Sequence, residues 1–323
     1  MVKPPPLLLP PPLLLIVGPT GVGKTAVAVC LARRVPMEVV SADSRQVYRG
    51  MDIATGKPTA GELKAVTHHL LDLIEPGERY NAARFRLDAS KAIEGIRAAG
   101  CLPVVVGGTG LYVRALLRGL DPAPPADPTL RATLEETARS KGPAALHERL
   151  EALDPGRAAQ IHPNDRVRIV RAIEKLATIE QVAANPVPAG SWTRAVTPWS
   201  VLMFGLRRER GALNGSLEER ARGMLAGGMM QEVRRLMAAG HDEAAPGMAG
   251  IGYRQLAAVA RGRLSEAEAL RLMTRDTQRY AKRQMTWFAR EPGIQWLDVD
   301  EVGGVEGAAE CIYKNIVREG WIE

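Results

Sequence analysis

Short runs of apolar residues alternate with longer amphipathic stretches in the first third of the chain. The apolar runs cover residues 13–17, 38–41 and 103–106, and each ends in a glycine-rich or polar turn. Stretches with helical periodicity lie between them, at residues 24–34 and 82–99. Because strands and helices that alternate in this way build βαβ units, the pattern predicts an α/β fold with a parallel sheet flanked by helices.

The pattern changes after residue 120. A Pro-rich joint at residues 121–128 leads into charged helical stretches that run to about residue 176, and a polar segment follows at 180–197. The run at 200–205 is typical of a strand, stretches at 217–239 and 265–290 are helical, and a last strand is expected near 295–299. We therefore predict a core of residues 1–120 and 200–323 with an inserted all-helical domain, 121–199.

Composition and charge indicate which partners and which cellular compartment fit this chain. Lys and Arg total 43 against 36 Asp and Glu, which fits an anionic partner such as RNA or a phosphorylated metabolite, or a basic surface with no polyanion. The three cysteines are widely spaced and lack metal-ligand spacing, so we expect free thiols, a reducing cytoplasmic compartment and no zinc site. The sequence contains no run of eighteen apolar residues, so we predict no membrane span. The prolines of residues 4–12 favour a polyproline-like leader over a signal peptide.

A phosphate-binding motif follows the first predicted strand and opens a helix. It consists of Gly18, Pro19, Thr20, Gly21, Val22, Gly23, Lys24 and Thr25. In this pattern backbone N–H groups point at phosphate oxygens, the lysine contacts the phosphates, and the Thr25 hydroxyl ligates Mg²⁺. The plainer alternative is a glycine-rich turn without a ligand. The motif predicts a P-loop NTPase-like sheet that binds a di- or triphosphate, and it leaves kinase, GTPase and transferase activities open.

Two further segments, 41–53 and 106–112, come directly after predicted strands. Carboxyl ends of parallel strands share one rim of the sheet, so Asp43 is expected to face the phosphate site. The alternative is that Asp43 is a helix cap or orders a metal ion. Adjacent side chains such as those of His68 and His69 point apart, so we interpret this pair as structural instead of metal-binding.

Seven blocks of the sequence resemble the bacterial tRNA dimethylallyltransferases, the IPP transferase family. They are residues 18–25, 41–46 with 51–58, 68–72, 107–112, 162–166 with 168–174, 250–255 and 280–288. The resemblance implies that the P-loop binds the diphosphate of dimethylallyl diphosphate, with Mg²⁺, in place of ATP. It also implies that the acceptor is N6 of the tRNA adenine at position 37, beside the anticodon.

The resemblance further implies that four residues are catalytic. Asp43 is the general base, Lys24 and Thr25 act at the diphosphate, and Thr109 contacts the tRNA near the reacting base. A base is needed because the lone pair of the exocyclic amine is delocalised into the purine, which makes the amine a weak nucleophile. The negative charge that grows on the departing diphosphate would be met by Mg²⁺, Lys24 and the P-loop amides.

The acceptor adenine must leave the stacked anticodon loop to reach a buried diphosphate. The residues expected to hold the tRNA are Asp43, Ser44, Arg45, Gln46, Thr109, Arg131, Val167, Arg168, Ile169, Val170, Arg171, Gly252, Tyr253, Arg254, Lys282, Arg283, Gln284, Thr286 and Trp287. For residues 280–290 the alternative is an amphipathic helix that packs Met285, Trp287 and Phe288 on the core. The expected partners are tRNA and dimethylallyl diphosphate, without a membrane, and the chain is expected to be a monomer.

Three positions depart from the family pattern. Ser216 stands where one of two arginines is usual, Arg84 replaces an acidic residue, and residues 175–189 lack a Gly-Arg/Lys-Pro turn. These departures change local contacts and leave the diphosphate and base-activation residues in place. Three rival functions stay open: an ATP-dependent small-molecule kinase, an adenylate isopentenyltransferase acting on free nucleotide, and an RNA-binding protein with a vestigial nucleotide pocket. The basic helical insert would have no role in the second of these.

Overall fold

The structure is a computed structural model that describes residues 10–120, 127–181 and 197–322. It divides into two compact units, Met1–Gly119 with Val196–Glu323 and Leu120–Ala195. The first unit contains the sheet, and the described residues of the second are helices and turns. Most of the predicted leader, most of the Pro-rich joint and most of the polar segment after the insert lie outside the described residues.

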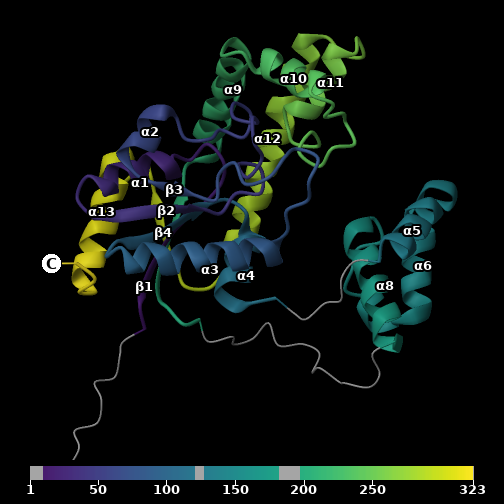
Figure 1. Ribbon diagram of the computed structural model, residues 1–323, viewed down its shortest axis with the longest axis horizontal. Helices are drawn as coiled ribbons and strands as arrows, with labels where there is room; N and C mark the ends of the chain where they lie inside the picture. The colour runs from purple at the N-terminus through teal and green to yellow at the C-terminus, as the bar shows by residue number, and fades with distance from the viewer. Residues whose placement is uncertain (1–9, 121–126, 182–196, 323) are drawn as a thin grey trace, which may run out of the picture. The chain divides into compact units, whose positions relative to one another are not determined.

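A parallel six-stranded sheet forms the centre of the first unit (Figure 1). Its strands are β1 (Pro12–Val17), β2 (Met37–Ser41), β3 (His68–His69), β4 (Leu102–Gly107), β5 (Ser200–Arg207) and β6 (Ile294–Asp298), arranged in the order β3-β2-β4-β1-β5-β6. The apolar runs predict five of these strands; the two-residue edge strand β3 has no such run. Strands β1 and β4 are covered on both faces, which is why their sequences are continuously apolar. The predicted parallel α/β sheet is confirmed.

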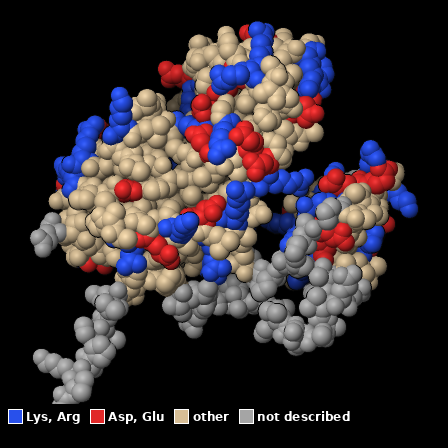
Figure 2. Space-filling model, viewed as in Figure 1, with Lys and Arg blue, Asp and Glu red and all other residues tan. Residues whose placement is uncertain are grey.

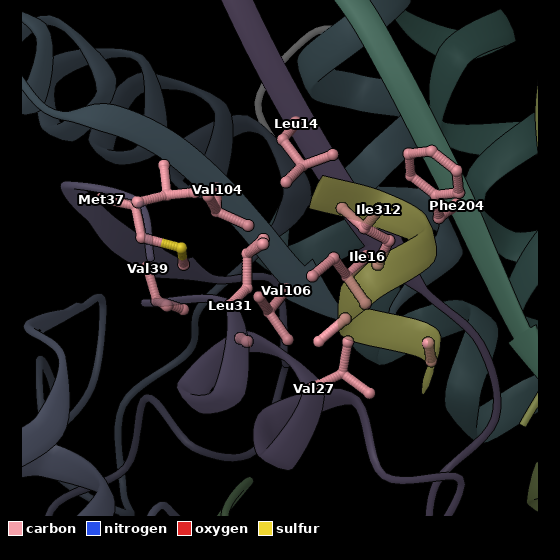
Figure 3. Packing of buried hydrophobic residues seen from close by; sticks show 14 of the residues in the cluster. Leu14, Ile16, Val27, Leu31, Met37, Val39, Val104, Val106, Phe204 and Ile312 are labelled. Atoms are coloured by element: carbon pink, nitrogen blue, oxygen red, sulfur yellow. The ribbon is translucent and has the colours of Figure 1, made fainter. Parts of the chain in front are cut away.

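Helices cover both faces of this sheet, and α10 and α11 pack on other helices of the unit beyond it. The helices of the unit are α1 (Lys24–Ala32), α2 (Ala60–Ala65), α3 (Ala82–Ala98), α4 (Gly110–Arg118), α9 (Arg210–Ala226), α10 (Met229–Ala238), α11 (Tyr253–Ala260), α12 (Glu266–Phe288) and α13 (Gly304–Arg318). On one face, Leu14 and Ile16 of β1 pack with Leu31 of α1 and Ile312 of α13 (Figure 3). Because side chains alternate along a strand, Leu13 and Leu15 point to the opposite face, which α3 covers.

One predicted helix is two helices. Residues 217–239 were expected to be continuous, but α9 ends at Ala226 and α10 begins at Met229. Gly228 adopts the left-handed conformation, with φ of 97°, at the N-cap of α10. Glycine reaches this conformation without the steric penalty of other residues, so the Gly227-Gly228 pair allows the chain to turn between the two helices.

The second unit has its own apolar core. Its helices are α5 (Pro128–Lys141), α6 (Pro143–Leu153), α7 (Pro155–Ala158) and α8 (Arg166–Gln181). Proline stands in the first turn of α5, α6 and α7, where its fixed φ fits and its missing N–H costs nothing. Leu134, Leu146, Leu150, Ile169 and Ile173 are fully or almost fully buried together. No described helix of either unit is long and apolar enough to cross a membrane.

Candidate active site

Three loops meet at the carboxyl ends of neighbouring strands. The P-loop follows β1, the Asp43 loop follows β2, and the turn at residues 107–110 follows β4. The strand order β2-β4-β1 places these ends side by side. Lys24 and Asp43 consequently line one cavity, as expected for residues that follow neighbouring strands of a parallel sheet.

The backbone of the P-loop is shaped by glycine at its start. Gly18 has φ of 142°, and a Cβ on it would lie 2.5 Å from the carbonyl oxygen of Leu206, so only glycine fits there. The Lys24 ammonium folds back and donates to the carbonyl oxygens of Gly18 at 3.1 Å and Pro19 at 2.7 Å. Helix α1 begins at Lys24, and the first amides of a helix have no acceptor within the helix. The loop therefore combines amide donors with a lysine, as an anion site requires.

Burial also changes the proton affinity of Lys24. It lowers the pKa of the ammonium from 10.5 to about 8, although the nearby charge of Asp43 acts in the opposite direction. Burial disfavours a charged amine because the surrounding protein solvates it less well than water does. A bound anion would restore this lost stabilisation, so the cavity is suited to a negatively charged ligand.

Asp43 is held by its own loop. Its Oδ1 accepts hydrogen bonds from the backbone N–H groups of Arg45 at 2.7 Å and Gln46 at 3.3 Å, as in an Asx turn. Its Oδ2 makes no hydrogen bond within the part of the chain that the structure describes. The neighbouring Ser44 N–H donates to Thr109 Oγ1 at 3.1 Å, which joins this loop to the turn after β4. One carboxylate oxygen is thus fixed, and the other is available to a proton donor in the cavity.

Two cavities adjoin at Asp43. The first, here named the P-loop cavity, has a volume of about 360 Å³ and includes Lys24 and Thr25. The second, here named the α12 cavity, has a volume of about 280 Å³ and includes Tyr280 and Arg283. Both are lined by Thr20, Asp43, Thr55 and Arg220. This arrangement can hold two ligands that meet at the Asp43 carboxylate.

The lining of the α12 cavity combines apolar, aromatic and basic side chains. Met224, Ile251 and Met273 give it apolar walls, and Tyr253, Tyr280, Arg45, Arg254 and Arg283 also line it. Burial, with a smaller contribution from the charge of Asp43, raises the pKa of Tyr280 to about 12, so its hydroxyl stays protonated near neutral pH. Flat apolar surfaces beside cations suit an unstacked nucleobase with its phosphates.

The structure brings many of the predicted tRNA residues to these cavities. Ser44, Arg45, Tyr253, Arg254 and Arg283 line the α12 cavity, and Gln46 lines the P-loop cavity. Gln46 donates to the carbonyl oxygens of Thr55 and Gly56, at 3.4 and 3.0 Å, and accepts from Ser41 Oγ at 2.9 Å. Its amide therefore supports the wall of the cavity through three bonds to protein groups.

Along α12 the predicted residues differ in exposure. Lys282, Arg283 and Thr286 are exposed, whereas Gln284 is buried. Trp287 is half-buried, and the guanidinium of Arg114 lies 4.3 Å from the centre of its ring. The tRNA contacts of Gln284 and Trp287 stay predictions: Gln284 is buried and lines the P-loop cavity, and Trp287 lies against Arg114 and Gly110 of α4.

Predicted residues of the helical unit fall into three groups. Val167 and Arg168 have exposed side chains, whereas Ile169 and Val170 are buried in the core of the unit. The guanidinium of Arg131 forms two hydrogen bonds to the buried Glu174, at 2.8 and 2.9 Å, and Arg171 donates to the same carboxylate at 3.0 Å. The side chains of Ile169 and Val170 thus belong to the core of the unit, and the Arg131 and Arg171 guanidinium groups pair with Glu174.

Arg220 is a site residue that the sequence prediction left out. It lines both cavities, beside Asp43. The available signal was the match of Arg220 to one of two arginines in the family pattern. Ser216, which stands at the other arginine position, lines the P-loop cavity and donates to the Leu213 carbonyl at 2.9 Å. Arg84, the second departure, lies over the ring of Tyr80 at 5.2 Å.

The two adjacent histidines have separate surroundings. His69 Nε2 contacts Glu38 Oε2 at 2.6 Å, and His68 Nδ1 contacts the Val66 carbonyl at 2.9 Å. His68 also lines the P-loop cavity. Charge alone does not mark a binding face: on the face in Figure 2, Lys and Arg are interspersed with Asp and Glu. The chemistry of the site therefore depends on the residues around the two cavities.

Comparisons with known proteins give the family of the chain. Residues 46–291 match the family described as "IPP transferase", and residues 11–75 match the one described as "Isopentenyl transferase". A protein named tRNA dimethylallyltransferase from Thermomicrobium roseum is 44% identical, over 94% of this chain and 91% of its own length. One of the same name from Desulforudis audaxviator is 43% identical, over 99% of this chain and 100% of its own length.

Solved structures give the same result. The tRNA isopentenylpyrophosphate transferase from Bacillus halodurans is 36% identical with a TM-score of 0.69, and the match covers 96% of this chain and 98% of that one. A eukaryotic dimethylallyltransferase acting on tRNA has a TM-score of 0.76 at 24% identity, covering 96% of this chain and 80% of its own, and supports the fold alone. The family match spans most of the chain, and near-full-length relatives exceed 40% identity. The chain therefore belongs to the IPP transferase family.

Proposed function

We propose that this protein is a tRNA dimethylallyltransferase, which transfers a dimethylallyl group from dimethylallyl diphosphate to N6 of adenosine 37 in tRNA. The names of its relatives support this function. The observation that carries it is the pair of adjoining cavities with the Asp43 carboxylate on their boundary. A diphosphate ester in one cavity and an adenine in the other would meet at that carboxylate.

The P-loop cavity would hold the donor. Lys24, the amides at the start of α1 and Arg220 would bind the diphosphate oxygens, and the Thr25 hydroxyl would hold Mg²⁺ together with those oxygens. The donor set fits this ion, because Mg²⁺ commonly binds one or two protein oxygens plus substrate phosphates. Bound there, Mg²⁺ would help to neutralise the negative charge of the diphosphate. These residues stabilise the leaving group as the bond between its oxygen and the allylic carbon breaks.

The α12 cavity would hold the acceptor. As the N6–carbon bond forms, the electron pair of the breaking carbon–oxygen bond goes to the diphosphate, and one N6 proton goes to the Asp43 carboxylate. The Arg45 and Gln46 amides orient one oxygen of Asp43, which leaves the other to accept this proton. Arg45, Arg254 and Arg283 would neutralise the phosphates that flank the extruded base.

The remaining proposed tRNA contacts line the α12 cavity, adjoin its lining residues or are exposed. Ser44, Arg45, Tyr253, Arg254 and Arg283 line the cavity, Gly252 directly precedes Tyr253, and Thr109 accepts from the Ser44 N–H. Lys282 and Thr286 of the first unit, and Val167 and Arg168 of the helical unit, are exposed. An enzyme acting on a free nucleotide would have no use for the exposed basic residues of the helical unit. We further propose that the protein acts in the cytoplasm, where its tRNA substrate is found and its cysteines stay reduced, and that it acts as a monomer.

Mass spectrometry of unmodified tRNA tests the function. Incubation with the protein, dimethylallyl diphosphate and Mg²⁺ should add one dimethylallyl group to adenosine 37. An equal concentration of AMP competing for labelled donor separates the tRNA enzyme from one that acts on free nucleotide, and labelled ATP with candidate metabolites detects a kinase. Label appearing on AMP or on a phosphorylated metabolite, with unmodified tRNA, would refute the proposal, as would tight tRNA binding without product.

A further inference from the structure

Gln284 lies on the helix with the exposed basic residues but does not share their exposure. The residue is 5% exposed, whereas Lys282, Arg283 and Thr286 on the same helix are exposed. Gln284 lines the P-loop cavity instead of the outer surface of the helix. A buried amide needs partners of its own, because an unpaired one costs free energy, and its partners indicate what it does.

Both ends of the Gln284 amide bind backbone groups of the candidate active site. Its Oε1 accepts from the Thr20 N–H at 2.8 Å, and its Nε2 donates to the Gly108 carbonyl at 2.9 Å. The primary amides of Gln and Asn can accept at one end and donate at the other in this way; a carboxylate only accepts, and an apolar side chain does neither. The amide therefore links the P-loop to the turn after β4.

The surroundings of Gln284 are fitted to it. A Cβ on Gly108 would lie 2.1 Å from Gln284 Nε2, so the absence of a side chain at this position makes room for the amide. Thr20, its other partner, lines both the P-loop cavity and the α12 cavity. A shift of Thr20 would therefore change the shape of the boundary between the two cavities.

The link continues to the Asp43 loop. Gly108 precedes Thr109, whose Oγ1 accepts from Ser44 N at 3.1 Å, beside Asp43. The loops after β1, β4 and β2 are thus joined in series, and Gln284 binds two of them from α12. Sites held in one geometry before binding avoid the free-energy cost of ordering them when the ligand arrives.

We propose that Gln284 is a positioning residue for the donor site: it fixes Thr20, and with it the P-loop, in the form that accepts the diphosphate, and it does not contact tRNA. This inference rests on the proposed function of the two cavities. It differs from the role that the sequence resemblance gives to this position, since a tRNA contact would act on the affinity for RNA.

The test compares full-length wild type with Gln284→Met and Gln284→Glu, which keep the length of the side chain. Methionine removes both hydrogen bonds, and glutamate places an acceptor against the Gly108 carbonyl. Gln278→Met is the matched control, because Gln278 lies on the same helix and its amide donates to the Asn214 carbonyl of α9 at 3.4 Å and not to a P-loop group. Thermal unfolding establishes that each variant is folded, and titration calorimetry measures the Kd for dimethylallyl diphosphate with Mg²⁺ and, separately, for unmodified tRNA.

Both Gln284 variants should raise the Kd and the KM for the donor about tenfold, equivalent to about 1.4 kcal/mol. Their Kd and KM for tRNA should stay within about twofold of wild type, as should every constant of Gln278→Met. Folded variants with unchanged donor affinity, or with weakened tRNA affinity alone, would overturn the inference while leaving the proposed function intact. A wild-type protein that neither bound nor used the donor would instead refute the proposed function.

Discussion

Replacing Asp43 by Asn isolates its role as a base from its role in the loop. The asparagine carbonyl oxygen can still accept from the Arg45 and Gln46 amides, as Oδ1 of Asp43 does at 2.7 and 3.3 Å. The amide cannot take a proton from N6. Since a positioned general base contributes about 10²- to 10⁴-fold to a rate, Asp43→Asn should lower the single-turnover rate by about that factor.

Donor binding should not be weakened by this substitution. The substitution removes a negative charge from the cavity that would hold the diphosphate, so the Kd for dimethylallyl diphosphate should stay the same or fall. The charge of Asp43 also raises the pKa of Lys24, which is about 8 in the wild type, so this pKa should fall further in the variant. Measurements near pH 7 or below keep Lys24 charged and separate the two effects.

The assay is single-turnover transfer of labelled dimethylallyl to unmodified tRNA, with the enzyme in excess. Asp43→Ala is the comparison: it should also abolish turnover and largely spare donor binding. It additionally loses both hydrogen bonds of the loop, at a cost of about 1 to 3 kcal/mol in the free energy of unfolding. An Asp43→Asn rate within threefold of wild type would show that Asp43 is not the base.

Three further predictions concern the charged groups around the site and in the helical unit. Because the pKa of Lys24 is about 8, its charge is present below that pH and is lost as the pH rises through it. The donor Kd should therefore increase about tenfold between pH 7 and pH 9, and titration calorimetry should show that donor binding takes up a proton above pH 8. A Kd independent of pH over this range would contradict the assignment. Arg220→Met should raise the donor Kd at least about tenfold, and the control Arg222→Met, an exposed residue of the same helix that pairs with Glu218, should not; equal effects would argue against a diphosphate contact. Glu174→Ala should destabilise the helical unit by about 1 to 3 kcal/mol, because it removes the hydrogen-bond acceptor of the Arg131 and Arg171 guanidinium groups; urea unfolding followed by circular dichroism measures this, and an unchanged midpoint would refute it.

The sequence predicts the parts of the site that consist of one continuous segment. The glycine spacing of the P-loop, the lysine at the start of α1 and the carboxylate after β2 can be read along the chain, because each follows a buried strand. The parallel sheet itself follows from apolar runs alternating with helices. The break between α9 and α10 was missed, although Gly227-Gly228 signalled it, because helical periodicity continues on both sides.

Other features depend on contacts between distant segments. Arg220 and Asp43 lie far apart in the chain, and only the packing of α9 beside the P-loop places them in the same cavity. Likewise, Ile169 and Val170 follow Arg168 in a segment rich in arginine, but the face of α8 that carries them is buried in the core of the helical unit, where α8 packs on α6. A motif identifies the residue types of a segment without showing which face of its helix is covered.

For this protein, the sequence by itself determined the strand pattern, the phosphate-binding loop and the position of the carboxylate, because these follow from local periodicity and from the backbone freedom of glycine. Only the tertiary structure decided that two cavities adjoin at Asp43 and that Gln284 binds Thr20, 264 positions away. Hydrogen bonds of this kind form when folding brings the two segments together, and no periodicity along either segment specifies the partner.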